Sequence, residues 1–192
     1  MPTIVHGFDW PDRVVVGTIG NPGARTFYLQ ARDGARLVTV ALEKEQSAAL
    51  AEKIDEILDG LIANENTSIT VPAVTPVELV DNEPLEQPVE PQFRAAALSL
   101  GWDPSTAQIV IEAYPFVEAD DDSTDEFGEP LPDSRAVEFE PEEMLVVRMP
   151  VGTARAFADR TLEIVGAGRP ICPFCGTPMD PDGHVCVVPD GF

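Results

Sequence analysis

The chain has 192 residues, 44% of them hydrophobic, and a formal net charge of −22. This length can build one or two small domains with a hydrophobic core, and the charge excludes a surface that binds nucleic acid or anionic membranes. No apolar run reaches the roughly 18 residues that a membrane span needs, and the first residues lack the basic and apolar regions of a secretory signal. We therefore expect a cytoplasmic protein without membrane or nucleic-acid partners.

The first part of the chain predicts three strands followed by a helix. Residues 13–20 are β-branched and apolar, and residues 26–43 indicate a hairpin in which Asp33 and Gly34 supply the positive φ angles of a type I′ turn. Residues 44–65 then change to a helical period. One apolar face of this helix consists of Leu50, Ile54, Ile57, Leu58 and Leu61.

A connector rich in proline and acidic residues follows, and we place it at residues 67–92. Its part from residue 71 to residue 92 holds five prolines, each of which lacks a backbone donor and restricts the residue before it. We expect an extended segment here, with a short strand at Pro76–Val80.

The second part repeats the order of the first. Strands are predicted at 93–101, 106–117 and 144–150, and a helix at 151–168 with one stripe on its surface. The acidic segment 118–143 carries twelve acidic residues and one basic residue, so we expect a mobile loop that is too charged to bury. The helical stripe consists of Ala154, Phe157, Thr161 and Val165.

Together these patterns predict an α+β fold built from two β-β-β-α pseudo-repeats, residues 1–66 and 93–168. Three strands and one helix bury too little surface alone, so the six strands and two helices would form one mainly antiparallel unit over residues 1–168. Residues 169–192 would form a separate small tail that resembles a zinc ribbon.

That tail contains all three cysteines and one of the two histidines, in the run CPFCGTPMDPDGHVC. Structural zinc sites use four thiolate or imidazole ligands, and Cys172, Cys175, His184 and Cys186 supply four candidates. The spacing of the second pair, H-x-C, is short, so Asp180 or Asp182 remains an alternative to the histidine. A closed set of four ligands predicts a structural zinc ion rather than a catalytic one.

Two other interpretations of the cysteines stay open. The sequence CPFC also occurs in the active sites of glutaredoxins, whose first cysteine needs a helix N-terminus. Here glycines and prolines follow the motif and argue against that helix. Alternatively, the cysteines are buried free thiols without a function.

Chemistry elsewhere in the chain has weaker signals. The glycine-rich segment 17–25 ends in Arg25 and can cradle a phosphate, but it lacks the lysine of a P-loop and favours a plain hairpin. His6, Asp9 and Asp12 can supply a general base, but we favour an N-terminal strand or arm pinned by Phe8 and Trp10. The acidic run 120–126 lacks the glycine of a calcium-binding EF-hand loop.

The run ICPFCGTPMDPDGHVC, the segment LVTVALEKEQ and the GRP before the first cysteine resemble an actinobacterial family without an assigned activity. The resemblance covers the whole chain. It implies zinc ligation by Cys172, Cys175, His184 and Cys186 and no catalytic residues. It also implies two protein partners encoded nearby, one like histidine phosphatases and one like phosphoinositide kinases. The ending VVPDGF keeps the family's final glycine and aromatic residue but not its basic position.

Three hypotheses for the function follow. The first, which we favour, is a non-enzymatic interaction or adaptor protein with a structural zinc ion and a protein partner. The second is an enzyme or a module that binds nucleotides or phosphorylated metabolites in a pocket between the pseudo-repeats, with His6, Arg25 and the loop Gly17–Gly23 as contributors. The third is a thiol-redox protein.

Overall fold

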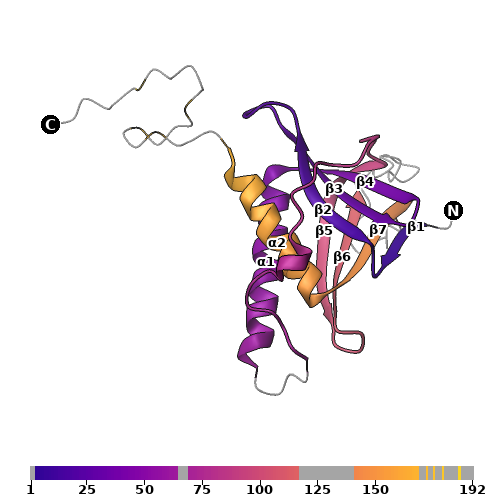
Figure 1. The fold of residues 1–192 in the computed structure, drawn as a ribbon. Helices are drawn as coiled ribbons and strands as arrows, with labels where there is room; N and C mark the ends of the chain where they lie inside the picture. The colour runs from indigo at the N-terminus through magenta and orange to yellow at the C-terminus, as the bar shows by residue number, and fades with distance from the viewer. Residues whose placement is uncertain are drawn as a thin grey trace, which may run out of the picture.

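The computed structural model describes residues 3–64, 69–116 and 141–168, together with Cys172, Cys175, Met179 and Cys186. It has an α+β fold with a seven-stranded, mainly antiparallel sheet and two α-helices (Figure 1). No helix within these ranges is long and apolar enough to cross a membrane. The strands are β1 Ile4–Asp9, β2 Arg13–Ile19, β3 Thr26–Asp33, β4 Arg36–Leu42, β5 Phe93–Asp103, β6 Gln108–Pro115 and β7 Glu143–Pro150, and the helices are α1 Lys44–Ala63 and α2 Val151–Gly166.

The predicted β-β-β-α order is present twice. Strands β2, β3 and β4 form an antiparallel meander that leads into α1, and β5, β6 and β7 form a second meander that leads into α2. The two meanders join where β4 and β5 run parallel over a short ladder, Val40 to Phe93 and Ala41 to Arg94. The fold class predicted from the sequence is therefore confirmed, with β1 as a seventh strand beyond the six expected.

The sheet curls back on itself. Its strand order is β1-β7-β6-β5-β4-β3-β2, so in a flat sheet the two outer strands would lie about 29 Å apart. Yet only residues 10–12 connect β1 to β2, and such a link spans at most about 14 Å. The Arg36 guanidinium at the start of β4 accordingly donates to the Gly7 carbonyl of β1 and lies 4.0 Å from the centroid of the Phe8 ring.

Both helices pack side by side on one side of the curled sheet, to the left in Figure 1. Their buried faces are those that the helical period indicates, because Leu50, Ile54 and Leu58 of α1 and Phe157 of α2 are at most 4% exposed. These side chains pack against alternate residues of the strands in one core that includes Val16, Leu29, Val40, Ile111 and Val147.

Several local predictions need correction. Asp33 pairs with Arg36 across the β3–β4 turn, so Gly34 and Ala35 are its central residues, and of the described non-glycine residues only Trp10 and Ala107 have a positive φ. The segment Val77–Leu79 is a 3-10 helix and not part of a strand. Trp10 is 58% exposed and does not pin the N-terminal strand, whereas Phe8 does, at 2% exposure.

The connector packs against the sheet, although its composition indicates an extended linker. Glu86 exchanges two hydrogen bonds with the side-chain amide of Gln30, which is itself only 2% exposed. Leu85 lies directly over Gly17 of β2, where a β-carbon would come within 2.5 Å of the leucine side chain. The part of the connector with Leu85 and Glu86 therefore covers the face of β2 and β3 that points away from the helices. The acidic segment predicted as a loop, 118–143, lies mostly outside the described residues, which resume at 141.

Candidate functional site

Three cysteines of the tail converge. The sulfur atoms of Cys172, Cys175 and Cys186 all lie within 4.8 Å of one another, and those of Cys172 and Cys186 are 3.8 Å apart. Cys172 is buried and the other two are partly buried. The two cysteines of C-P-F-C and the later Cys186 therefore meet as the spacing predicts, whereas His184, Asp180 and Asp182 lie outside the described residues.

The separation of these sulfurs suits a tetrahedral metal site. A Zn–S bond of about 2.3 Å in a tetrahedron places two sulfurs about 3.8 Å apart, which is the distance between Cys172 and Cys186. A disulfide would instead require about 2.05 Å. Three soft thiol ligands favour zinc or another thiophilic ion over calcium or magnesium.

The neighbouring thiols also change the pKa of Cys186. The hydrogen bond with Cys175, followed by desolvation and the contact with Cys172, raises the pKa of Cys186 to about 11. In the absence of a cation the cluster thus keeps this proton at neutral pH. A divalent cation reverses the balance, because it stabilises the neighbouring thiolates that otherwise repel one another.

The other residues considered for chemistry do not converge. His6 on β1 contacts Glu143 of β7, with 3.1 Å between Nε2 and Oε2. Arg25 donates to the Ile164 carbonyl near the end of α2 and lies over the Phe27 ring. The segment 17–25 forms the end of β2 and the hairpin loop that leads to β3, as we favoured from the sequence.

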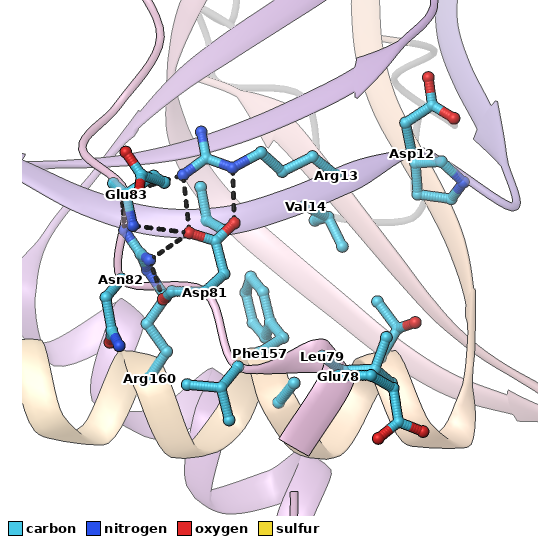
Figure 2. A pocket seen from close by; sticks show the side chains of 15 residues that line it. Asp12, Arg13, Val14, Glu78, Leu79, Asp81, Asn82, Glu83, Phe157 and Arg160 are labelled. Atoms are coloured by element: carbon cyan, nitrogen blue, oxygen red, sulfur yellow. Dashed lines mark hydrogen bonds and ion pairs between the residues drawn. The ribbon is translucent and has the colours of Figure 1, made fainter. Parts of the chain in front are cut away.

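A cleft does lie between the two pseudo-repeats, but different residues form it. It has a volume of about 420 Å³ and lies between β2, the connector and α2 (Figure 2). Each of its three walls contributes side chains, for example Arg13 from β2, Asp81 from the connector and Phe157 from α2. Neither His6 nor Arg25 lines it, so the contributors proposed from the sequence are wrong for this cleft.

One aspartate, Asp81, links the walls of the cleft through hydrogen bonds. Asp81 accepts hydrogen bonds from Arg13, at 2.6 and 3.0 Å, and from Arg160, at 2.7 Å. The hydrogen bond from Arg13 lowers the pKa of Asp81 despite its partial burial. Both arginines also donate to the Glu83 carbonyl, and Arg160 reaches the Val16 carbonyl of β2. The arginines thereby fix the connector to β2 and α2.

A third arginine, Arg155, links the two helices. Arg155 of α2 has a side chain that is 5% exposed and pairs with Asp55 and Asp59 of α1, at 2.8 and 2.7 Å. Burial by itself would lower the pKa of Arg155, but the two carboxylates outweigh it and the net shift is upward. Arg155 also donates to the Pro72 carbonyl, which anchors the start of the connector.

Sequence reasoning missed these arginines, although a signal was available. The chain contains only 12 lysines and arginines, and Arg155 and Arg160 lie five residues apart on a helix with an apolar stripe. A cation beside such a stripe in so acidic a chain requires a carboxylate partner. The pattern did not indicate which acidic residues would meet it.

Of the comparisons with known proteins, one matches almost the whole chain. No curated protein and no solved structure shows a significant match. A protein-family model described as "Protein of unknown function (DUF3090)" matches residues 6–186, a range that includes both pseudo-repeats and all three cysteines. The chain belongs to this DUF3090 family.

Proposed function

We propose that this protein is a zinc-binding interaction protein in which the metal stabilises the tail and takes no part in a reaction. The convergence of Cys172, Cys175 and Cys186, with a separation of 3.8 Å between two of the sulfurs, carries the proposal. His184 is the fourth ligand in this proposal, with Asp180 or Asp182 as alternatives. A closed site of this kind contributes on the order of 10 kcal/mol to the folding of a small segment.

The first test is elemental analysis of the purified full-length chain. We expect one zinc ion per chain, retained through dialysis against a weak chelator and lost after Cys175→Ser. Replacement of an alanine outside the tail, Ala35→Ser, is the matched control, because Ala35 lies in an exposed turn of the β3–β4 hairpin. Metal-free protein with three reactive thiols, or a disulfide that forms and breaks reversibly, would contradict the proposal.

The identity of the fourth ligand has its own measurement. X-ray absorption at the zinc edge distinguishes three sulfurs and one nitrogen from three sulfurs and one oxygen. We expect a nitrogen from His184, and its replacement by alanine should lower zinc affinity by at least the roughly tenfold that loss of a mere hydrogen-bond partner of a ligand costs. An unchanged spectrum in His184→Ala would assign the position to an aspartate.

Two observations support an interaction role over catalysis. The partner of His6 in the structure is the Glu143 carboxylate, 3.1 Å away, which is not a side chain that His6 would activate as a nucleophile. The net charge of −22 is also an attractive field for a basic partner. Partnership with the phosphatase-like and kinase-like proteins that the resemblance implies is part of this proposal. Purification of the tagged chain from its native cell should recover one of them in a fixed ratio.

The cleft supports a second candidate function, the binding of a nucleotide or phosphorylated metabolite. Its volume and its position between the pseudo-repeats favour a small ligand. Against this, Arg13 and Arg160 already donate to Asp81 and to backbone carbonyls, so phosphate would have to displace a carboxylate. Thermal-shift measurements with nucleotides and sugar phosphates test it, and stabilisation that Arg160→Gln removes would favour this candidate.

A further inference from the structure

The cleft has two chemically different ends. Arg13 and Arg160 gather around Asp81 at one end, on the left in Figure 2, while Asp12 and Glu78 lie at the other end, on the right. Of the six charged residues that line the cleft, four are acidic and two are basic, which leaves two negative charges. Both arginines stand at the end that also holds Asp81 and Glu83, so the excess of negative charge belongs to the end with Asp12 and Glu78.

Glu78 is the carboxylate best placed to receive a ligand. It makes no hydrogen bond or ion pair within the described part of the chain, and it is exposed on the 3-10 helix Val77–Leu79. Asp12 is half-exposed and shares its Oδ2 with Arg32, at 3.1 Å, and with the Gly34 amide. The acidic end therefore has carboxylate oxygens that no lysine or arginine of the described residues contacts.

Between the two ends the cleft is apolar. Phe157 and Ala156 of α2 and Val14 of β2 line it, together with Leu79 and Val80 of the connector. Such a surface suits the aliphatic stem of a lysine or arginine side chain, which buries its methylene groups while its charged head stays at the polar end.

The connector adds an exposed apolar strip beside the cleft. Val74, Val77 and Val80 are 75%, 85% and 53% exposed, although the segment is anchored on both sides. Arg155 donates to the Pro72 carbonyl before the strip, and Asp81 holds both arginines after it. Apolar side chains that are held in place, open to water and next to a cleft suit an interaction surface.

We infer that the cleft and the strip Val74–Val80 bind a short, extended, basic segment of a partner protein. A lysine or arginine of that segment enters the cleft toward Glu78 and Asp12, and its apolar neighbours pack on Val77 and Val80. The charge of the cleft argues against an anionic peptide, and the field of the whole chain favours the same sign of partner. This inference rests on the interaction role proposed above and specifies the partner's chemistry.

The probe is a fluorescein-labelled heptapeptide, Ala-Val-Lys-Val-Lys-Val-Ala, compared with the same peptide carrying glutamate in place of lysine. Fluorescence anisotropy with the full-length protein at low salt measures both. We expect binding of the lysine peptide only, weakened by added salt because the charges of the contact are exposed. Equal binding of the two peptides, or binding of neither, would overturn the inference.

Two pairs of variants locate the contact. Glu78→Gln should weaken binding of the lysine peptide about fivefold, the upper range for one exposed ion pair, while Glu52→Gln on the exposed face of α1 should not change it. Val80→Ser should also weaken binding, while Val5→Ser should not, because Val5 is equally exposed, at 54%, but lies on β1. If Glu52→Gln weakens binding as much as Glu78→Gln, the attraction belongs to the whole acidic surface and the inference fails.

The same preparations separate this inference from the proposed function. Zinc content and melting temperature are measured for every variant, and we expect both to match the wild-type chain. Protein with one zinc per chain that ignores the lysine peptide would overturn the basic-segment inference and leave the zinc site standing. Metal-free protein that still binds the peptide with the predicted variant pattern would overturn the zinc site and support the basic-segment inference.

Discussion

Replacement of Asp81 by asparagine is the sharpest test of how the connector is held. The change keeps the shape of the side chain but removes the charge that two arginines share. The side chains of Arg13 and Arg160 are only 12% and 13% exposed, so each loses a partner in a place where water replaces it poorly. Breaking a fully buried pair costs about 3–5 kcal/mol. Because asparagine keeps one acceptor and Asp81 is 27% exposed, we expect a loss of about 2–3 kcal/mol.

The assay is urea unfolding followed by circular dichroism, with zinc content matched between samples. Asp33→Asn is the control, since Asp33 lies exposed at the β3–β4 turn and its replacement should stay within about 0.5 kcal/mol. A loss below that limit for Asp81→Asn would refute the reasoning. It would mean that Leu85 and the backbone contacts hold the connector without the ion cluster.

Three further predictions concern the connector and the tail. The pKa of Asp81 is lowered in the folded chain, so its contribution to stability is complete above its usual pKa of 3.8. This contribution is lost as the pH falls through the lowered value. The urea midpoints of the wild type and of Asp81→Asn should therefore converge only in strong acid. Gly17→Ala places a β-carbon 2.5 Å from Leu85 and should lower the free energy of unfolding by about 1–2 kcal/mol. Gly60→Ala, in open space on α1, should instead raise it by about 0.5–1 kcal/mol in the same urea assay. Removal of zinc by a strong chelator should expose Cys175 and the other two thiols to a colorimetric thiol reagent, and a slow reaction after chelation would contradict metal protection.

The regular elements were predictable because their signals are local. The run of β-branched residues in 13–20 indicates a buried strand, and the helical period from Leu50 to Leu61 indicates a buried helix face. The repeated order of elements then implied a shared sheet. The β3–β4 hairpin was found for the same reason, although the register moved its turn by one residue, to Gly34 and Ala35.

The contacts of the connector were not predictable, because they join residues far apart in the chain. Nothing in the sequence pairs Asp81 with Arg13 and Arg160, and nothing marks Gly17 as the place where Leu85 lies. Composition led us to treat residues 67–92 as a passive link. The candidate metal site behaved differently, since its residues lie within fifteen positions of one another and their spacing alone brought three cysteines together.

Because β1 pairs in parallel with β7, Ile4 opposite Glu143, the two pairing partners leave the ribosome at very different times. At the usual pace of translation, the first strand waits on the order of ten seconds for its neighbour. During that interval Phe8, which is 2% exposed in the folded chain, lacks the neighbouring strand that helps to bury it. Nascent chains halted before β7 should therefore be captured by holdase chaperones through the segment Ile4–Asp9, and chains released after it should not.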